Sequence, residues 1–208
     1  MKNYTNVGAS GLGVERKLNR HHFMFFKSVD VKGKKILDVG CGRGEFLKVC
    51  KNKGAQKLMG LDPDPKNVSF LSAFNIDVLN DLYDLNTDLN GFDPHFITIF
   101  EVIEHLYDPH PLIKAAYEHL KKSKGSLFVS TPNAFNFMRL LKFSFHQRHH
   151  DTLMDPVISS DAQHIRGFSF GMVEDLLKMH GFINVRRISK RVIGRYSEQT
   201  ILVVGDVG

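Results

Sequence analysis

The sequence predicts an α/β domain in which a mainly parallel sheet carries helices on both faces. Apolar runs of strand length alternate with longer segments of helical periodicity over most of the chain, which is the pattern of successive βαβ units. A glycine-rich segment follows the first of these apolar runs, as in folds that bind nucleotides. The length of 208 residues suits one well-buried core. We therefore expect a single domain over 1–208.

The expected elements follow in a regular order. An N-terminal arm over 1–34 contains a short helix at 18–29. Short apolar runs then predict five strands, at 35–39, 57–61, 77–79, 95–100 and 126–130. Three helical segments lie between these strands, at 45–52, 65–74 and 109–121.

The last part of the chain departs from this alternation. It holds a helix at 169–180 and two apolar runs at 182–189 and 200–204, which we expect to pair as a hairpin because they are close in sequence. A long connection over 131–168 precedes that helix, and a sheet does not require it. Long connections in compact domains are often lids or binding elements, so we expect a lid-like insertion there.

Composition excludes several classes of protein. Apolar residues make up 42% of the chain and charged residues 24%, as in globular domains. No apolar stretch approaches the roughly 20 residues needed to span a bilayer, and the N-terminus lacks the apolar core of a signal peptide, so we expect a cytoplasmic location. Two cysteines are too few for a disulfide framework. The net charge of +6 is spread over several Lys and Arg groups, which favours solvated surfaces over a nucleic-acid footprint.

The segment at 36–44 reads Ile-Leu-Asp-Val-Gly-Cys-Gly-Arg-Gly and is the most informative part of the sequence. Glycines at alternate positions let the backbone turn tightly and let a ligand approach the strand end and the next helix. Asp62 ends the following strand, where a carboxylate can accept bonds from ribose hydroxyls. This spacing also suits a dinucleotide, so a nicotinamide-dependent oxidoreductase is an alternative, although it predicts a longer chain.

The order of further motifs resembles the class I S-adenosylmethionine-dependent methyltransferases, and among them the ubiquinone-pathway O-methyltransferases. The matching segments are 36–46, 60–62, 80–82, 100–109, 130–133 and 164–181. The resemblance implies a Rossmann-like three-layer sandwich whose seven-stranded, mostly parallel sheet ends in an antiparallel strand. It also implies S-adenosylmethionine as the cofactor.

The resemblance assigns cofactor contacts residue by residue. Around the methionine portion it places residues of the first strand and loop, namely Asp38, Gly40, Cys41, Gly42 and Gly44. Asp62 would bind the ribose, with Pro63 beside it. Asp81 would accept a bond from the adenine amino group, next to the Leu82 backbone. Asp81 could instead be a turn residue, in which case Asp77 or Asp84 would substitute for it.

Glu101, Glu104 and His105 are the candidate catalytic residues. Methyl transfer from a sulfonium requires alignment of the nucleophile and, for a hydroxyl, removal of a proton. If that stretch forms a helical turn, the spacing i, i+3, i+4 puts the three side chains on one side of it. Two interpretations remain open. With His164, the three residues would bind Mg²⁺ or a similar cation, as the resemblance implies. Alternatively, Glu101 contacts the cofactor and His105 acts as a base or orienting group.

Two segments of the long connection have competing interpretations. The tract HQRHHD, with His146, His149, His150 and Asp151, is more typical of a polar loop than of a metal site. As a helix, 135–145 would have a narrow polar stripe and a broad apolar surface. The domain itself, a substrate, another subunit or a membrane surface must cover such a surface, and we favour packing within the domain.

The sequence leaves the methyl acceptor open. A hydroxyl of a small molecule, such as a phenol, a quinone precursor or a sugar, fits a single compact domain best. Ribose 2′-O-methylation of small RNA is the alternative, although aromatic residues do not interleave with a continuous basic groove. A third hypothesis is a regulatory subunit that binds S-adenosylmethionine without turnover.

Overall fold

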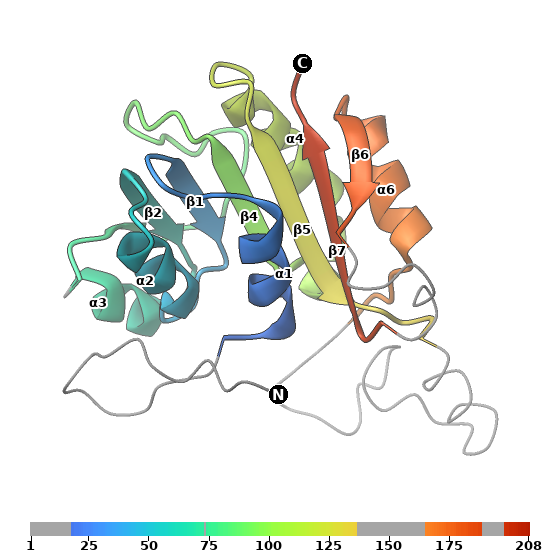
Figure 1. Ribbon diagram of the computed structural model, residues 1–208, viewed down its shortest axis with the longest axis horizontal. Helices are drawn as coiled ribbons and strands as arrows, with labels where there is room; N and C mark the ends of the chain where they lie inside the picture. The colour runs from blue at the N-terminus through green and yellow to red at the C-terminus, as the bar shows by residue number, and fades with distance from the viewer. Residues whose placement is uncertain (1–17, 73, 137–164, 189–197) are drawn as a thin grey trace.

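The computed structural model describes residues 18–72, 74–136, 165–188 and 198–208. Its seven strands form one sheet with helices on both faces (Figure 1). The strands are β1 (Lys35–Val39), β2 (Lys57–Leu61), β3 (Asp77–Leu79), β4 (Phe96–Phe100), β5 (Ser126–Pro132), β6 (Ile183–Arg187) and β7 (Thr200–Asp206). The predicted α/β fold class is confirmed.

The sheet has the order β3-β2-β1-β4-β5-β7-β6. Strands β1 to β5 are all parallel to one another, whereas β7 runs antiparallel to both β5 and β6. The expected pairing of the last two strands is therefore confirmed, with β7 inserted between β5 and β6. Because helices cover both faces, the central strands are buried at almost every position instead of alternating.

Six helical elements lie among the described residues. They are α1 (Arg20–Ser28), α2 (Glu45–Asn52), α3 (Pro65–Ser72), the 3₁₀ helix η1 (Ile103–His105), α4 (His110–Leu120) and α6 (Phe170–Met179). Most match the predicted ranges to within two residues at each end. The third helix is described as far as Ser72, and the chain turns at Asn75, which has a left-handed backbone with φ of 51°.

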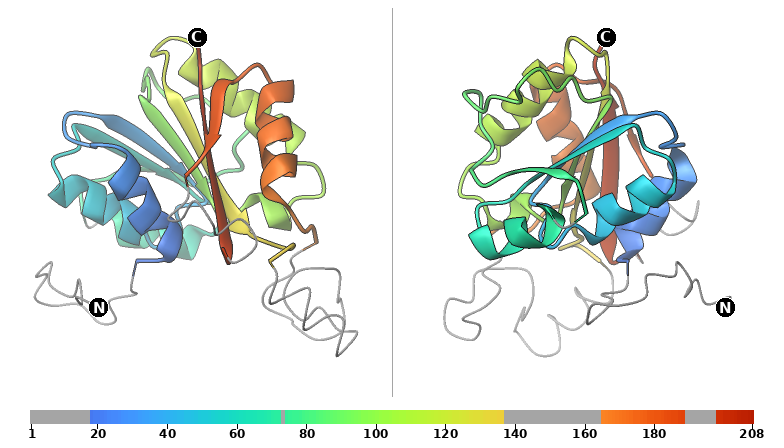
Figure 2. Two further views of the ribbon diagram at one scale, coloured as in Figure 1. Left: turned by 45° about the vertical axis from the view of Figure 1, so that its right-hand side comes forward. Right: turned by 90° about the vertical axis from the view of Figure 1, so that its left-hand side faces the viewer.

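The helices form two sets, one on each face of the sheet, as Figure 2 shows. An apolar layer lies between each set and the sheet. Helices α4 and α6 pack on one face of the sheet, over Leu37, Ile97 and Val203. Helices α1, α2 and α3 pack on the other face, over Ile36 and Phe128. Alternate residues of each strand thus belong to opposite layers.

Helix α1 is part of this second layer. The side chain of Phe25 is fully buried, with its ring centroid 4.7 Å from that of Phe128 and 5.9 Å from that of Phe100. The helix also lies against β7. It therefore brings its own side chains to the central strands β4 and β5.

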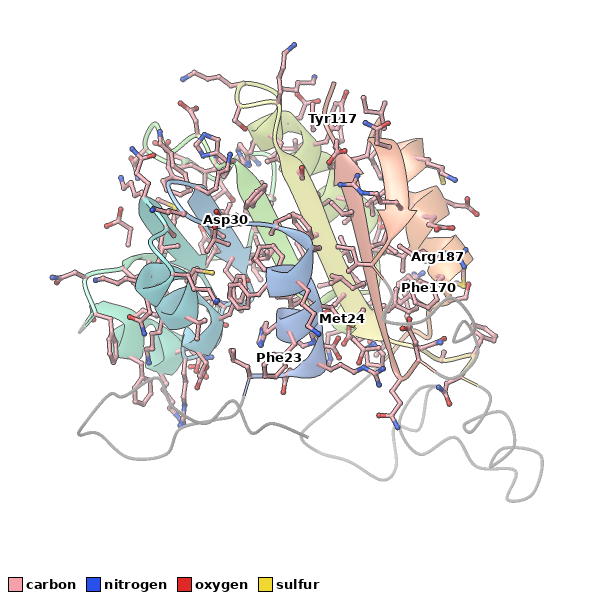
Figure 3. All side chains as sticks on the ribbon, viewed as in Figure 1. Phe23, Met24, Asp30, Tyr117, Phe170 and Arg187 are labelled. Atoms are coloured by element: carbon pink, nitrogen blue, oxygen red, sulfur yellow. The ribbon has the colours of Figure 1, made fainter. Side chains whose placement is uncertain are left out.

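Arg187, at the end of the edge strand β6, links this edge of the sheet to α6. Its guanidinium donates from Nε and Nη2 to the two carboxylate oxygens of Glu174 in α6, at 2.6 and 2.8 Å. It also lies 5.1 Å from the ring centroid of Phe170, its neighbour in Figure 3. A bidentate pair of this kind fixes geometry as well as charge.

The two ends of the predicted lid-like connection lie side by side. Asn133 forms a parallel bridge with Phe168, whose carbonyl accepts a bond from Ala134 N at 3.1 Å. Most of the connection, residues 137–164, lies outside the described residues. The predicted helix at 135–145 therefore stays a prediction, as does the division into a single domain, an arm and a lid. Within the described ranges, no helix is both long and apolar enough to cross a membrane.

Candidate active site

The glycine loop lies at the carboxyl end of β1, next to the end of β2. Gly40 and Cys41 donate their backbone N–H groups to the Leu61 carbonyl, at 2.7 and 3.1 Å. Gly40, Gly42 and Gly44 have φ values of 73°, 53° and 73°, which L side chains rarely adopt. The loop then leads directly into α2, so its backbone N–H groups lie beside a helix N-terminus.

These glycines have different surroundings. A Cβ atom on Gly40 would lie 2.5 Å from Val102 Cγ2, and one on Gly44 would lie 1.8 Å from Leu71 Cδ2. A Cβ on Gly42 would meet no atom within 4 Å. Packing therefore excludes a side chain at Gly40 and Gly44, whereas Gly42 borders open space that a ligand can enter.

Asp62 connects the ends of the first three strands. Its carboxylate accepts bonds from Gly42 N at 2.8 Å, from Asp64 N at 2.9 Å and from Asn67 Nδ2 at 3.1 Å. Its backbone carbonyl accepts a bond from Asn80 Nδ2 at 2.9 Å. A carboxylate offers about four acceptor positions, so the described bonds leave one, on the oxygen that faces Gly42.

Asp38 is buried beneath the loop. The hydroxyl of Thr98 in β4 donates to its Oδ1 at 2.6 Å. Burial raises the pKa of Asp38 to about 7, with the nearby Asp62 charge adding to the rise and the Thr98 bond opposing it. Through the bond from Thr98, the buried Asp38 links β1 to β4. Its contact with the cofactor stays a prediction.

The candidate adenine-side residues lie on an exposed turn after β3. The Asp81 carboxylate accepts a bond from Leu82 N at 2.7 Å, and the Leu82 side chain is 68% exposed. Asp84 likewise accepts a bond from a local backbone group, Asn86 N, at 2.7 Å. Asp77 begins β3 and so lies at the end of the sheet opposite to the loop, where it pairs with Lys57 at 3.2 Å. Its position excludes Asp77 as a substitute for Asp81.

Glu101 follows β4 and has an unusual backbone, with φ of 55°. Its N–H donates to the Ser130 carbonyl at 3.0 Å, and its Oε1 accepts a bond from the Ser130 hydroxyl at 2.9 Å. The next residue, Val102, is the one that approaches Gly40. The Glu101 side chain, 31% exposed, therefore stands beside the glycine loop.

Glu101, Glu104 and His105 do not face one side together, so that expectation is wrong. Glu101 lies outside the 3₁₀ helix at 103–105, and Glu104 and His105 are neighbours within it, so their side chains point in different directions. Glu104 is 1% exposed, whereas His105 is on the surface. The three side chains thus have different environments.

Glu104 is a buried acid. Burial raises its pKa to about 7, partly opposed by the nearby Thr131 hydroxyl. Among the described residues, its carboxylate oxygens lack a partner with hydrogen-bond geometry. Its backbone carbonyl accepts bonds from Ile165 N and Arg166 N, at 2.9 and 3.2 Å, where the chain returns from the long connection.

The predicted metal site is not supported. In the part of the chain that the structure describes, no three His, Cys, Asp or Glu residues come together to hold an ion. His164, the fourth predicted ligand, lies outside the described residues, as does the tract with His146, His149, His150 and Asp151.

Sequence reasoning missed His21 and His22, which α1 brings to Glu101. His21 Nδ1 lies 3.5 Å from Glu101 Oε1, and the His21 ring is 5.0 Å from that of Phe100. Burial lowers the pKa of His21 to about 4, and burial with the neighbouring His21 lowers that of His22 to about 3. Their only sequence signal was a pair of histidines on a helix with an apolar face.

A glycine loop after β1, an acidic residue ending β2 and an antiparallel β7 together define a Rossmann-like domain of the methyltransferase type. The family model described as "Methyltransferase domain" matches residues 14–186. The chain belongs to this methyltransferase family.

Curated relatives and solved structures agree with this assignment. The ubiquinone biosynthesis O-methyltransferase of Neisseria meningitidis serogroup C is 32% identical over 113 residues, covering 50% of this chain and 46% of that protein. The enzyme of the same name from Acinetobacter baylyi is 37% identical over 110 residues, covering 49% and 44%. The chain thus matches about half the length of these relatives. A SAM-dependent methyltransferase from Archaeoglobus fulgidus shares the fold, with a TM-score of 0.59, 18% identity and coverage of 89% and 92%.

Proposed function

We propose that the chain is an S-adenosylmethionine-dependent methyltransferase that methylates a hydroxyl oxygen of a small molecule. The observation that carries this proposal is the bond from Gly42 N to Asp62, beside open space at the carboxyl end of the sheet. Ligands of such sheets bind at this edge. The names of the curated relatives support an oxygen acceptor.

The residues that would hold the cofactor come from three strand ends. The backbone of Gly40, Cys41, Gly42 and Gly44 and the N-terminus of α2 suit the carboxylate of the methionine portion. The remaining acceptor position of Asp62 suits a ribose hydroxyl, with Pro63 next to it. Asp81 would accept a bond from the adenine amino group, next to the Leu82 backbone. For this, the bond from Leu82 N to the Asp81 carboxylate would have to break.

Glu101 is the described carboxylate best placed to act on the acceptor. The cofactor supplies a methyl group already activated on a sulfonium. Transfer of that methyl group to the acceptor oxygen would release the hydroxyl proton, which a base of this chain would take up. Glu101 stands beside the glycine loop and is partly exposed, so it can receive that proton. Roles for the buried Glu104 and the surface His105 stay predictions.

Calorimetry tests the cofactor, with S-adenosylmethionine and NADH as the two ligands. We expect binding of S-adenosylmethionine only. Binding of NADH alone would support the oxidoreductase, and no affinity for either ligand would overturn the proposal.

Transfer of a labelled methyl group tests the acceptor. Incubation with separated small-molecule, glycan and RNA fractions should label a small molecule. Labelled RNA, with binding that weakens steeply as salt rises, would instead support the ribose methyltransferase. Cofactor binding without transfer to any fraction would indicate the regulatory subunit. Labelling of acceptors only when they are bound to liposomes would point to a membrane surface, for which 135–145 is the candidate segment.

A further inference from the structure

The histidine pair on α1 reaches Glu101 through a series of short contacts. Asn19 N lies 3.1 Å from His22 Nδ1, and the Nε2 atoms of His22 and His21 lie 3.2 Å apart. His21 Nδ1 then faces Glu101 Oε1 at 3.5 Å, slightly beyond a hydrogen bond. Four groups thus form one continuous line from the start of α1 to the end of β4.

The chemistry of the groups sets the direction of every contact in this line. A backbone N–H can only donate, so His22 Nδ1 must accept and the proton of the neutral ring is on Nε2. That N–H can only donate to His21 Nε2, so the proton of His21 is on Nδ1. His21 therefore presents a donor to Glu101.

The opposite assignment would leave like groups facing each other. A proton on Nε2 of His21 would require an acceptor at His22 Nε2, and so a proton on His22 Nδ1. That proton would then face the N–H of Asn19, 3.1 Å away. His21 is buried and His22 is half-buried, and the pKa values of both lie far below 7, so neither ring is doubly protonated at pH 7.

The packing around the pair keeps the rings in place. The His22 ring stacks on Phe46 with an interplanar angle of 17° and centroids 5.1 Å apart. The two histidine rings meet edge to face, with centroids 4.2 Å apart. Phe46 and Phe100 are themselves buried. Rotation of either imidazole would therefore require the apolar layer to move.

Glu101 has a left-handed backbone with φ of 55°, and strained residues of this kind cluster at functional sites. Two donors, the Ser130 hydroxyl and His21 Nδ1–H, converge on Oε1 of Glu101 from β5 and from α1. They hold the carboxylate from two sides.

We propose that His21 and His22 are positioning residues, which act in series to orient the Glu101 carboxylate at the reaction centre. The proposal rests on the function proposed above, since it gives Glu101 a task in methyl transfer. The 3.5 Å contact shortens to a hydrogen bond when the cofactor and acceptor are bound, as catalytic contacts often do.

Nitrogen NMR of protein with ¹⁵N-labelled histidine tests the pair directly. We expect His21 as the Nδ1–H tautomer, which is the less common one in water, and His22 as the Nε2–H tautomer, both at pH 7. A proton on Nε2 of His21 would overturn the proposal. This readout needs no methyl acceptor, so it decides on the pair even if the proposed function fails.

Three variants then test the effect on Glu101. His21→Phe keeps an aromatic ring but removes the donor, and we expect kcat to fall by about 10- to 100-fold with unchanged affinity for S-adenosylmethionine. His21→Asn places an amide N–H at the Nδ1 position and should restore most of kcat. His110→Phe, which alters a surface imidazole that contacts His180 at 2.9 Å, is the control and should match the wild type.

Equal losses in His21→Phe and His21→Asn would indicate a purely structural role and overturn the proposal. Wild-type kcat in His21→Phe would overturn it as well. Circular dichroism of each variant separates these outcomes from unfolding. If His21→Phe does not fold, the tautomers and the His21→Asn variant alone decide.

Discussion

Gly42 is the residue at which packing and ligand access can be separated. Its φ of 53° is positive, like the 70° of Gly33 in a distant turn, and a Cβ atom at either position would meet no other atom within 4 Å. The two glycines therefore impose the same backbone cost on a substitution. Only Gly42 borders the open space beside Asp62.

Alanine at these two positions should separate stability from binding. We expect Gly42→Ala and Gly33→Ala each to lose about 1–2 kcal/mol of unfolding free energy, because alanine must adopt a left-handed backbone. Only Gly42→Ala should also lose affinity for S-adenosylmethionine, by tenfold or more. Urea unfolding and calorimetry measure the two effects. Equal affinities in the two variants would contradict a cofactor at this loop.

Asp62→Asn tests the carboxylate that accepts three bonds. Whichever oxygen becomes the amide, at least one N–H group among Gly42, Asp64 and Asn67 then faces another donor, which costs about 1–3 kcal/mol. That cost lowers stability. Because a neutral amide is also a weaker acceptor for a ribose hydroxyl than a carboxylate, we expect affinity for S-adenosylmethionine to fall about 10- to 100-fold. Asp30→Asn is the control, since Asp30 also accepts a backbone bond, from Lys32 N at 2.9 Å, but precedes β1. A similar loss in both variants would argue against a direct role of Asp62.

At the scale of elements, α1 contributes to the hydrophobic core, which its sequence alone did not indicate. Phe25 has no exposed surface and contacts aromatic rings from α2, β4 and β5. Two positions earlier, Phe23 is 39% exposed. The same residue type on the same helix thus occurs in two environments.

Phe25→Ala should therefore be far more damaging than Phe23→Ala. Truncation of a buried phenylalanine costs about 3–5 kcal/mol, whereas surface changes usually stay within about 0.5 kcal/mol. Guanidinium unfolding of both variants gives the comparison. Losses of the same size would show that α1 does not contribute to the core.

Elements with a clear period were predictable, and contacts between distant elements were not. The apolar runs of β1 and β2 lie at the predicted residues because strands covered on both faces are continuously apolar. The turn at 103–105 was misjudged because an α-helical period was assumed where the chain forms a 3₁₀ turn. The glycine loop and Asp62 were found from local sequence, since strand ends bring them together. His21 reaches Glu101 from a distant part of the sequence, through packing that no local pattern encodes.

At the scale of the whole molecule, four buried groups set opposing responses to pH. His21 and His22 have pKa values lowered to about 4 and about 3 in the folded protein. Below pH 6.5, their imidazoles therefore bind protons in the unfolded chain but not in the folded one. Their contribution to stability is present above pH 6.5 and is lost as pH falls. Asp38 and Glu104 have pKa values raised to about 7, so their contribution is present below about pH 4 and is lost as pH rises to 7.

Without the two histidines, the dependence of stability on pH should follow the carboxyl groups of Asp38 and Glu104. In the double variant His21→Gln and His22→Gln, we expect stability relative to the wild type to increase as pH falls from 7 to 4.5, by up to about 5 kcal/mol for the two groups together. Thermal unfolding followed by circular dichroism across this range measures the difference. A difference between the two proteins that is the same at every pH would contradict the assignment of the acid response to the pair.

The position of β7 between β5 and β6 also governs the order in which the sheet can be completed. Strand β6 precedes β7 in the chain, yet its hydrogen bonds to the sheet all run to β7, in the described pairing. Strand β6 can therefore join the sheet only after β7 has paired with β5. Until then, the edge of β5 is unpaired. Because such edges can pair with other chains, the interval before β7 arrives is the stage at which this protein is most exposed to self-association during folding.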